Sequence, residues 1–223
     1  MMRFLKSVAL ALCLLLPAQA QIFTPPIIFT GAGGGGITYA TWDPAHKGAA
    51  CTLTGANLIA TVTIPATGWT VSNLGRSSQK YYWEITASGA NAAQLEFGIA
   101  DSTYIAGAGG QPDLSAHAWI YYGATGSIYL AGSTSTAGPT FGVGDIISIA
   151  YDAGGGKIWF AKNGTWILSG NPGTGANPVG SGLSGTMYAV IGEGAGASAG
   201  GIANFGATAF TYSVPSGFNS GLY

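Results

Sequence analysis

The chain has 223 residues, of which 38 are glycine, 12% are aromatic and only 7% are charged, with a formal net charge of −1. Beyond residue 20 its basic residues are scattered, which argues against the clustered phosphate contacts of nucleic-acid binding. The aromatic content argues against disorder and predicts a packed core, with most glycines in turns, bulges and linkers.

Residues 1–20 have the three-part layout of a secretory signal peptide. Arg3 and Lys6 precede an apolar run, and Pro17-Ala18-Gln19-Ala20 supplies the small residues that a signal peptidase recognises. The run is too short to span a bilayer, which needs about twenty residues. We therefore expect cleavage near Ala20 and a mature domain that is secreted, periplasmic or at the cell surface, and not embedded in the membrane.

Residues 21–38 are predicted to form a linker or an arm. Pro25-Pro26 favours extended backbone, and the glycines of residues 31–36 favour flexibility. The apolar residues of this segment could instead form an edge strand or dock onto an assembly partner; they are Ile22, Phe23, Ile27, Ile28 and Phe29.

A single domain is predicted from residue 39 to residue 223, built of short strands separated by turns rich in Gly, Ser and Asn. Outside residues 144–166, strands are expected at residues 50–53, 57–64, 80–87, 94–100, 118–122, 127–131, 187–192, 201–205 and 210–212. Cys51 is the only cysteine left after cleavage. We expect it to be buried and inert, with an intermolecular bridge as the rarer alternative.

The most informative stretch is residues 144–166. Apolar and polar residues alternate through Ile147, Ile149 and Tyr151, then a turn-forming run precedes a second strand. Asn163-Gly164 is the strongest short hairpin signal and predicts a second reversal. The stretch therefore predicts a three-stranded antiparallel meander.

No long helical period follows the signal peptide, so the fold class is all-β, a sandwich or barrel. Residues 105–115 lack periodicity and are expected to form a long loop, where binding residues tend to lie on a rigid β scaffold.

We find no catalytic or metal-binding constellation. Glu84 is isolated, and Glu96 and Asp101 are expected on opposite faces of one strand, which does not suit the paired carboxylates of a glycosidase. His46 and His117 are the only histidines, and no nucleophile elbow accompanies them. We predict a protein without enzymatic activity, metal or cofactor.

Several short motifs, in order, resemble the SPRY domain family. They are Trp42-Asp43-Pro44, residues 80–85, residues 97–100, Gly144-Asp145 with residues 157–164, Asn204-Phe205-Gly206, and residues 215–218. The resemblance implies a concanavalin-like bent antiparallel β-sandwich whose loops bind a partner, usually a peptide segment of another protein. It also implies that Trp83, Trp159, Phe97, Phe160 and Phe205 are core residues. The strings at residues 42–48 and 216–221 resemble SPRY modules of phage and bacterial structural proteins.

The same resemblance implies a binding surface at one edge of the sandwich. Tyr104 is at a loop position that lines this surface in the family, Gly192 and Glu193 follow a strand that leads to it, and His46 and Lys47 could form its rim. The predicted function is an exported module that binds a protein partner. Two alternatives stay open: lectin-like binding of surface polysaccharide through Trp69, Tyr104 and Trp119 if these rings are exposed, and a structural subunit of a virion or appendage that assembles through residues 22–29.

Overall fold

The computed structural model describes residues 36–196 and 198–223. The predicted signal peptide and residues 21–35 of the predicted arm lie outside the described residues. One compact unit spans Ile37–Tyr223. In this part of the chain, no helix is long and apolar enough to cross a membrane.

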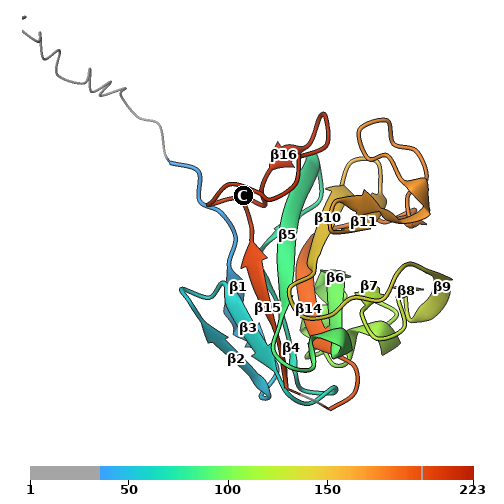
Figure 1. Cartoon of the computed structure of the whole chain (residues 1–223). Coiled ribbons are helices and arrows are strands. Elements are labelled where there is room, and N and C mark those ends of the chain that lie inside the picture. The colour runs from blue at the N-terminus through green and yellow to red at the C-terminus, as the bar shows by residue number, and fades with distance from the viewer. Residues whose placement is uncertain (1–35, 197) are drawn as a thin grey trace, which may run out of the picture. The chain divides into compact units, whose positions relative to one another are not determined.

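The unit is an antiparallel sandwich of two β-sheets (Figure 1). The first, sheet A, has the strand order β1 (Trp42–Lys47), β4 (Trp69–Arg76), β14 (Met187–Glu193), β6 (Leu95–Asp101), β7 (Ala118–Tyr122), β8 (Ser127–Leu130), β9 (Ser133–Ala137). The second, sheet B, has the order β12 (Thr165–Trp166), β11 (Lys157–Lys162), β10 (Ile146–Asp152), β5 (Lys80–Ser88), β15 (Ala199–Asn204), β3 (Ile59–Val62), β2 (Cys51–Thr54).

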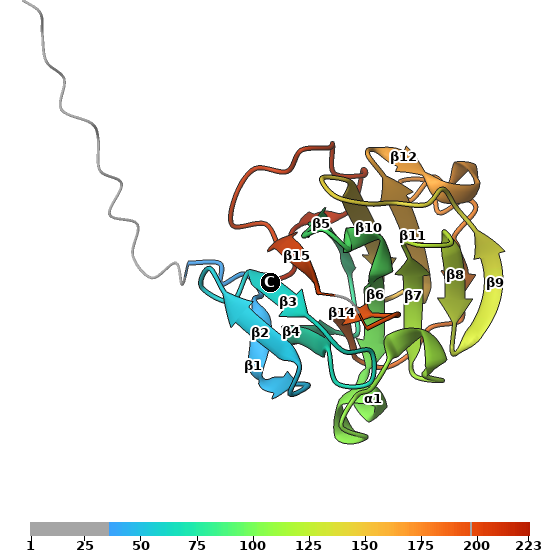
Figure 2. The same cartoon turned by 60° about the horizontal axis from the view of Figure 1, so that its bottom comes forward.

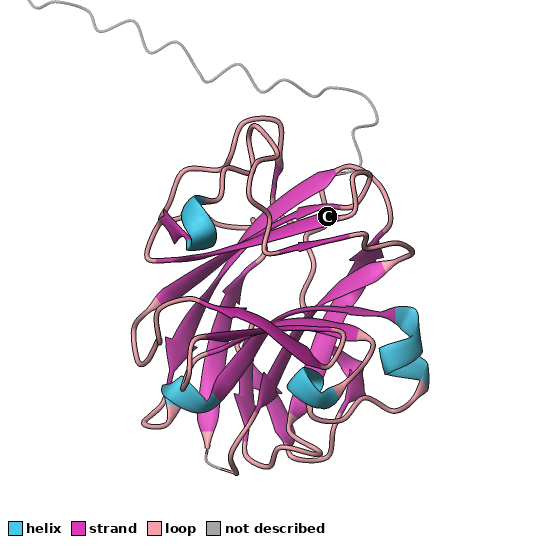
Figure 3. Ribbon diagram, turned by 90° about the vertical axis from the view of Figure 1, so that its right-hand side faces the viewer, coloured by secondary structure: helices cyan, strands magenta, loops and turns pink. Residues whose placement is uncertain are grey.

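Smaller elements complete the unit. In sheet B, β13 (Gly180–Ser181) pairs with β11, and β16 (Asn219–Ser220) pairs with β5 in parallel. The helical pieces are short (Figure 3); they are α1 (Ser102–Ala106) and the 3₁₀ turns η1 (Ala92–Gln94), η2 (Pro112–Leu114) and η3 (Ile167–Ser169). The predicted fold class is confirmed, because the described chain forms two antiparallel sheets in one domain.

The predicted core residues are buried. Trp83, Phe97, Phe160 and Phe205 belong to the main apolar cluster, whereas Trp159 belongs to a separate cluster with Tyr82. Cys51 is also buried and unpaired, and its burial raises the pKa of the thiol to about 11. The expected inert, buried cysteine agrees with this environment.

The predicted meander is present as β10, β11 and β12. Asn163 and Gly164 both have positive φ, 48° and 79°, and Lys162 faces Thr165 across the hairpin. This is the backbone of a two-residue turn that matches the twist of its strands. The short, local signal was therefore sufficient to predict the turn.

The outer face of each sheet is covered by a loop segment. Residues 102–115 pack on sheet A, where Tyr104 joins Val71, Ile120 and Val190 in an apolar cluster. The C-terminal segment, residues 205–218, covers sheet B through half-buried apolar side chains that pack against Tyr82 and Trp159; these are Phe210, Val214 and Phe218. The centres of β5 and β6 are therefore buried on both faces.

Some expected elements differ from the structure. Residues 210–212 form no strand, because this part of the chain belongs to the covering segment of sheet B. The strands β1, β4 and β9 and the two-residue strands β13 and β16 were not predicted. β1 contains Pro44 and an irregular register, and β9 is polar and largely exposed, so neither carries an alternating apolar pattern.

Candidate binding face

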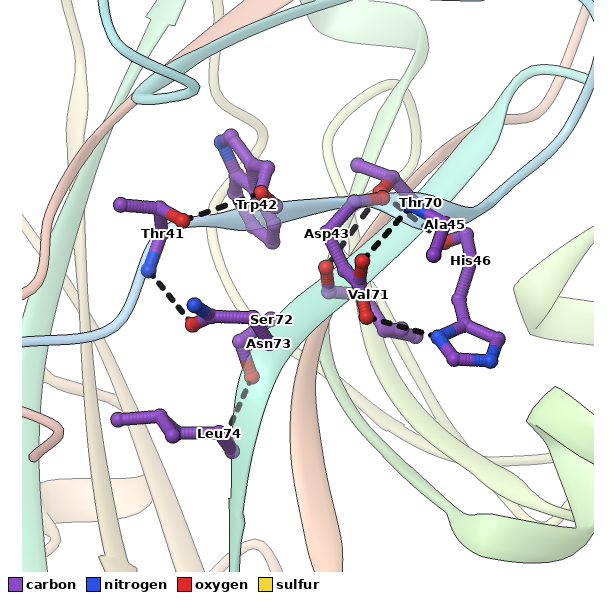
Figure 4. A network of polar contacts seen from close by, with 10 residues as sticks. All are labelled: Thr41, Trp42, Asp43, Ala45, His46, Thr70, Val71, Ser72, Asn73 and Leu74. Carbon is purple, nitrogen blue, oxygen red and sulfur yellow. Dashed lines mark hydrogen bonds and ion pairs between the residues drawn. The ribbon is translucent and has the colours of Figure 1, made fainter.

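A bulge in β1 displays residues 43–46 at the edge of sheet A. Trp42 faces Ser72 and Lys47 faces Thr70, so five steps along β1 are matched by two along β4. The Thr70 hydroxyl lies inside the bulge, 3.3 Å from the Asp43 carbonyl oxygen and 3.2 Å from that of His46 (Figure 4). Such bulges re-aim side chains, and Pro44 fits here because it lacks the N–H that a regular ladder would need.

Polar contacts hold the displayed residues in place. One oxygen of Asp43 accepts the Ala45 N–H at 2.8 Å, and the other lies 2.7 Å from His46 Nδ1. The Lys47 ammonium donates to the Cys51 carbonyl oxygen at 2.7 Å. The His46 side chain is 52% exposed. The bulge therefore presents an oriented imidazole and a lysine stem to solvent.

The helix α1 supplies the opposite side of the same surface. Asp101 caps it by accepting the N–H groups of Thr103 and Tyr104 at 2.7 and 3.0 Å, and its second oxygen lies 2.9 Å from His117 Nδ1. This cap fixes the first turn, so that Tyr104 points into the sheet A cluster while Ile105 stays partly exposed.

Two shallow depressions meet at His46 and Ile105. The first, about 390 Å³, also contacts Asp43, Asn73 and Tyr188, and the second, about 380 Å³, extends over Lys47, Thr67 and Trp69. We call this surface the His46 face. It joins β1, β4, α1 and β14 and is the side of the domain at which α1 and β1 lie in Figure 2. A lining that mixes apolar side chains with polar and charged groups suits recognition of a protein surface.

The face contains no catalytic unit among the described residues. Ser102 borders the first depression with Asp43 and His46, but no hydrogen bond joins its hydroxyl to the imidazole. A nucleophile needs such contact with its base to be activated. No group of three acidic, histidine or cysteine side chains in the described chain could hold a metal ion.

The sequence matches a family model described as the SPRY domain over residues 80–198, more than half of the chain. The chain belongs to the SPRY domain family. SPRY domains are typically protein-binding modules and are generally non-catalytic. The matched region contains both the meander and α1, whereas β1 with His46 and Lys47 lies ahead of it.

Solved SPRY structures share the fold at low sequence identity. The SPRY domain of human HERC1 is 18% identical, with a TM-score of 0.57, and the match covers 73% of this chain and 96% of that one. The TRIM65 PSpry domain is 11% identical, with a TM-score of 0.52 and coverage of 75% and 90%.

A third match is to stonustoxin, which is 14% identical with a TM-score of 0.51; it covers 75% of this chain but only 27% of the toxin. Comparison with curated protein sequences finds no match.

The structure separates the predicted site residues of this SPRY domain into two groups. His46 and Lys47 line the depressions, and their predicted role at the rim of a binding surface stays a prediction. The expected loop exposure of Tyr104 is wrong, since its ring is 2% exposed, packs edge-on against Trp69, and its hydroxyl donates to the Gly110 carbonyl oxygen at 2.6 Å. Tyr104 supports the face from beneath.

Gly192 and Glu193 are also buried. A Cβ at Gly192 would lie 2.4 Å from Pro112, so the glycine allows η2 to pack on β14. Both oxygens of Glu193 accept backbone N–H groups, those of Ala195 and Gly196, at 2.7 and 2.8 Å. Gly192 thus allows the covering segment of sheet A to pack closely, and Glu193 holds the turn after β14. Their direct role in binding stays a prediction.

Sequence reasoning missed two central residues of the face, Ile105 and Tyr188. They come from α1 and β14, which are far apart in the chain. The sequence did contain a local signal for α1, because Asp101 is a residue type that favours the N-cap of a helix. In the helical turn that follows, Tyr104 is buried and Ile105 stays partly exposed.

A buried acid pair lies beneath the covering segment of sheet A. Glu96 Oε2 on β6 accepts the Asp113 N–H at 3.2 Å, whereas Glu96 Oε1 and Asp113 Oδ1 have no hydrogen-bond partner in the described chain. Burial and the neighbouring Asp113 charge raise the pKa of Glu96 to about 9, and burial also raises the pKa of Asp113. Glu96 therefore keeps its proton at neutral pH.

We predict that Glu96→Gln removes a decline of stability with pH. Because the folded-state pKa of Glu96 is raised, its contribution is full below the ordinary pKa of glutamic acid and falls as pH rises toward about 9. Urea unfolding of both proteins across this range measures the effect. The variant should gain on the wild type by at most about 1.4 kcal/mol per pH unit. An unchanged pH slope would contradict the assignment.

Proposed function

We propose that this SPRY domain is an exported, non-enzymatic module that binds a protein partner through the His46 face. The observation that carries the proposal is the meeting of two depressions at His46 and Ile105, over a floor fixed by Trp69 and Tyr104. A floor that packing holds in place beneath depressions of mixed polar and apolar lining lowers the ordering cost of binding a peptide or protein segment.

Three further observations support the parts of this proposal. SPRY domains typically bind proteins, and the match to the family covers α1 and β14, which supply one side of the face, whereas β1 and β4 lie ahead of the matched residues. Export is supported by the charged, apolar and small-residue regions of residues 1–20. A fold without a disulfide is compatible with export here, since the described chain buries its core between two large sheets.

The lectin-like alternative through Trp69, Tyr104 and Trp119 loses its basis. Trp69 and Tyr104 are buried against each other, and Trp119 packs partly against the main core. A sugar ring can stack only on an exposed aromatic face.

We predict that Ile105→Asp weakens partner binding by about tenfold or more, because it places a charge at the centre of the face. A random peptide library displayed on phage is selected against the immobilised full chain, and the affinity of the enriched peptides is then measured for each variant. Val143→Asp is the matched control, since Val143 is exposed and lies in neither depression. Equal affinity of the Ile105→Asp and Val143→Asp variants would overturn the site.

The alternative of a structural subunit, phage-derived or bacterial, rests on the uncharged apolar arm at residues 22–29. Removing residues 21–36 from the full chain tests it by sedimentation analysis of the oligomeric state. If the arm docks onto a neighbouring copy, the truncated chain should lose its assemblies and keep peptide binding. An oligomeric state that does not change would exclude assembly through the arm.

A further inference from the structure

A second concave surface lies on the outer side of sheet B, away from the residues of the His46 face. It is bounded by β12, by the loop that follows η3 and by the C-terminal covering segment. Figure 2 labels β12. An outer compartment of about 520 Å³ and an inner one of about 280 Å³ are both bounded by Trp166 and Ser213. We call this surface the Trp166 groove.

One wall of the groove is held by a buried carboxylate. Glu84 accepts the N–H groups of Thr211 and Tyr212 at 2.9 and 2.8 Å, and the Tyr82 hydroxyl donates to it at 2.7 Å. Three donors converge on one carboxylate that is almost fully buried. The covering segment is therefore fixed to β5, and this wall exists before any ligand arrives.

The other wall is the loop around residues 170–176, which hydrogen bonds hold in place. The Trp159 indole N–H donates to the Ala176 carbonyl oxygen at 2.8 Å, and the Lys157 ammonium donates to that of Gly175 at 3.2 Å. Asn171 and Ala176 exchange a pair of backbone hydrogen bonds at 2.9 and 3.0 Å. A preorganised wall reduces the entropy lost on binding.

The floor of the inner compartment contains a hydroxyl with unused acceptor capacity. The Tyr82 hydroxyl lies 3.0 Å from Ser148 Oγ as well as 2.7 Å from Glu84, but a phenol has a single proton. The carboxylate only accepts, so Tyr82 donates to Glu84 and Ser148 donates to Tyr82. Ser148 is 1% exposed and borders the groove, and its lone pairs remain for a donor from a ligand.

The chemistry of the lining is neutral. None of the described residues that line either compartment carries a charge. Trp166 is half-buried and contacts Tyr82 edge-on at 6.4 Å, and its indole N–H has no hydrogen-bond partner in the described chain. Hydroxyl and amide side chains surround it, among them Asn171, Thr174 and Ser213.

We propose that the Trp166 groove binds a neutral oligosaccharide. A sugar ring presents an apolar C–H face that can pack on Trp166, and its hydroxyl groups both donate and accept, as do the groups at the rim. A single hydroxyl can enter the small inner compartment and donate to Ser148. A peptide main chain would lay its N–H and C=O groups along a strand edge, which is less well matched to an isolated acceptor at the bottom of a pocket.

The test uses the full chain and a panel of neutral gluco-, galacto-, manno- and xylo-oligosaccharides, with binding measured by calorimetry. At least one oligosaccharide should bind, and Trp166→Ala should weaken it by about tenfold. Ser148→Ala should weaken sugar binding several-fold, although this variant keeps the hydrogen bond between Tyr82 and Glu84. Tyr188→Ala is the control, because it alters an aromatic side chain of the His46 face and should leave sugar binding unchanged. The unfolding midpoint of each variant confirms its fold.

Three results with the oligosaccharides would overturn the proposal. They are no binding of any oligosaccharide, binding that survives both Trp166→Ala and Ser148→Ala, and a loss of sugar binding in Tyr188→Ala equal to that in Trp166→Ala. Binding of an uncharged peptide with the sequence of residues 23–29, lost in Trp166→Ala, would also overturn it and assign a peptide groove. Peptide selection on the His46 face is a separate measurement, so either site can fail while the other stands.

Discussion

The central strands of both sheets are buried on both faces, and the rest of the structure follows from the need to cover them. β5 and β6 are buried along nearly their whole length. Because packing of the two sheets against each other buries only their inner faces, the outer faces of these strands need a separate cover. Residues 102–115 cover sheet A and residues 205–218 cover sheet B. The hydrophobic burial that drives folding thus also places two loop segments on the surface.

Each covering segment is fastened by a buried carboxyl group, and the two solutions differ. Glu84 is surrounded by hydrogen-bond donors, two from the backbone and one from Tyr82. Glu96 has one backbone donor, and its burial and the neighbouring acid Asp113 raise its pKa, so that it retains a proton. Both arrangements avoid an uncompensated buried charge, which would cost several kcal/mol. The surfaces proposed for binding lie at the margins of these two fastened segments.

Local signals in the sequence were sufficient for the scaffold. Alternation around Ile147 and Ile149 and the Asn163-Gly164 turn predicted the meander, because hairpin geometry depends on adjacent residues. The core positions of Trp83 and Phe97 followed from the resemblance to the SPRY family, and both residues are buried. These features need no knowledge of which strands become neighbours.

The binding surfaces depend on long-range packing and were predicted only in part. His46 and Lys47 were expected at the rim, but the face also needs Ile105 and Tyr188 from distant elements. Tyr104 was expected in an open loop, whereas the Asp101 cap turns it into sheet A. Phe210 was expected in a strand because aromatic residues favour strands, yet it packs on Tyr82 from a covering segment. In each case, packing against residues that are distant in the chain decides where the side chain lies.

Native-state hydrogen exchange of backbone amides tests most directly whether the covering segments are fixed parts of the sandwich. The amides of Thr211 and Tyr212, bonded to Glu84, and that of Asp113, bonded to Glu96, are the reporters. The account predicts that they exchange as slowly as amides in β5 and β6, through the same global opening. Exchange at the rate of unprotected loop amides, with β5 and β6 still protected, would contradict it.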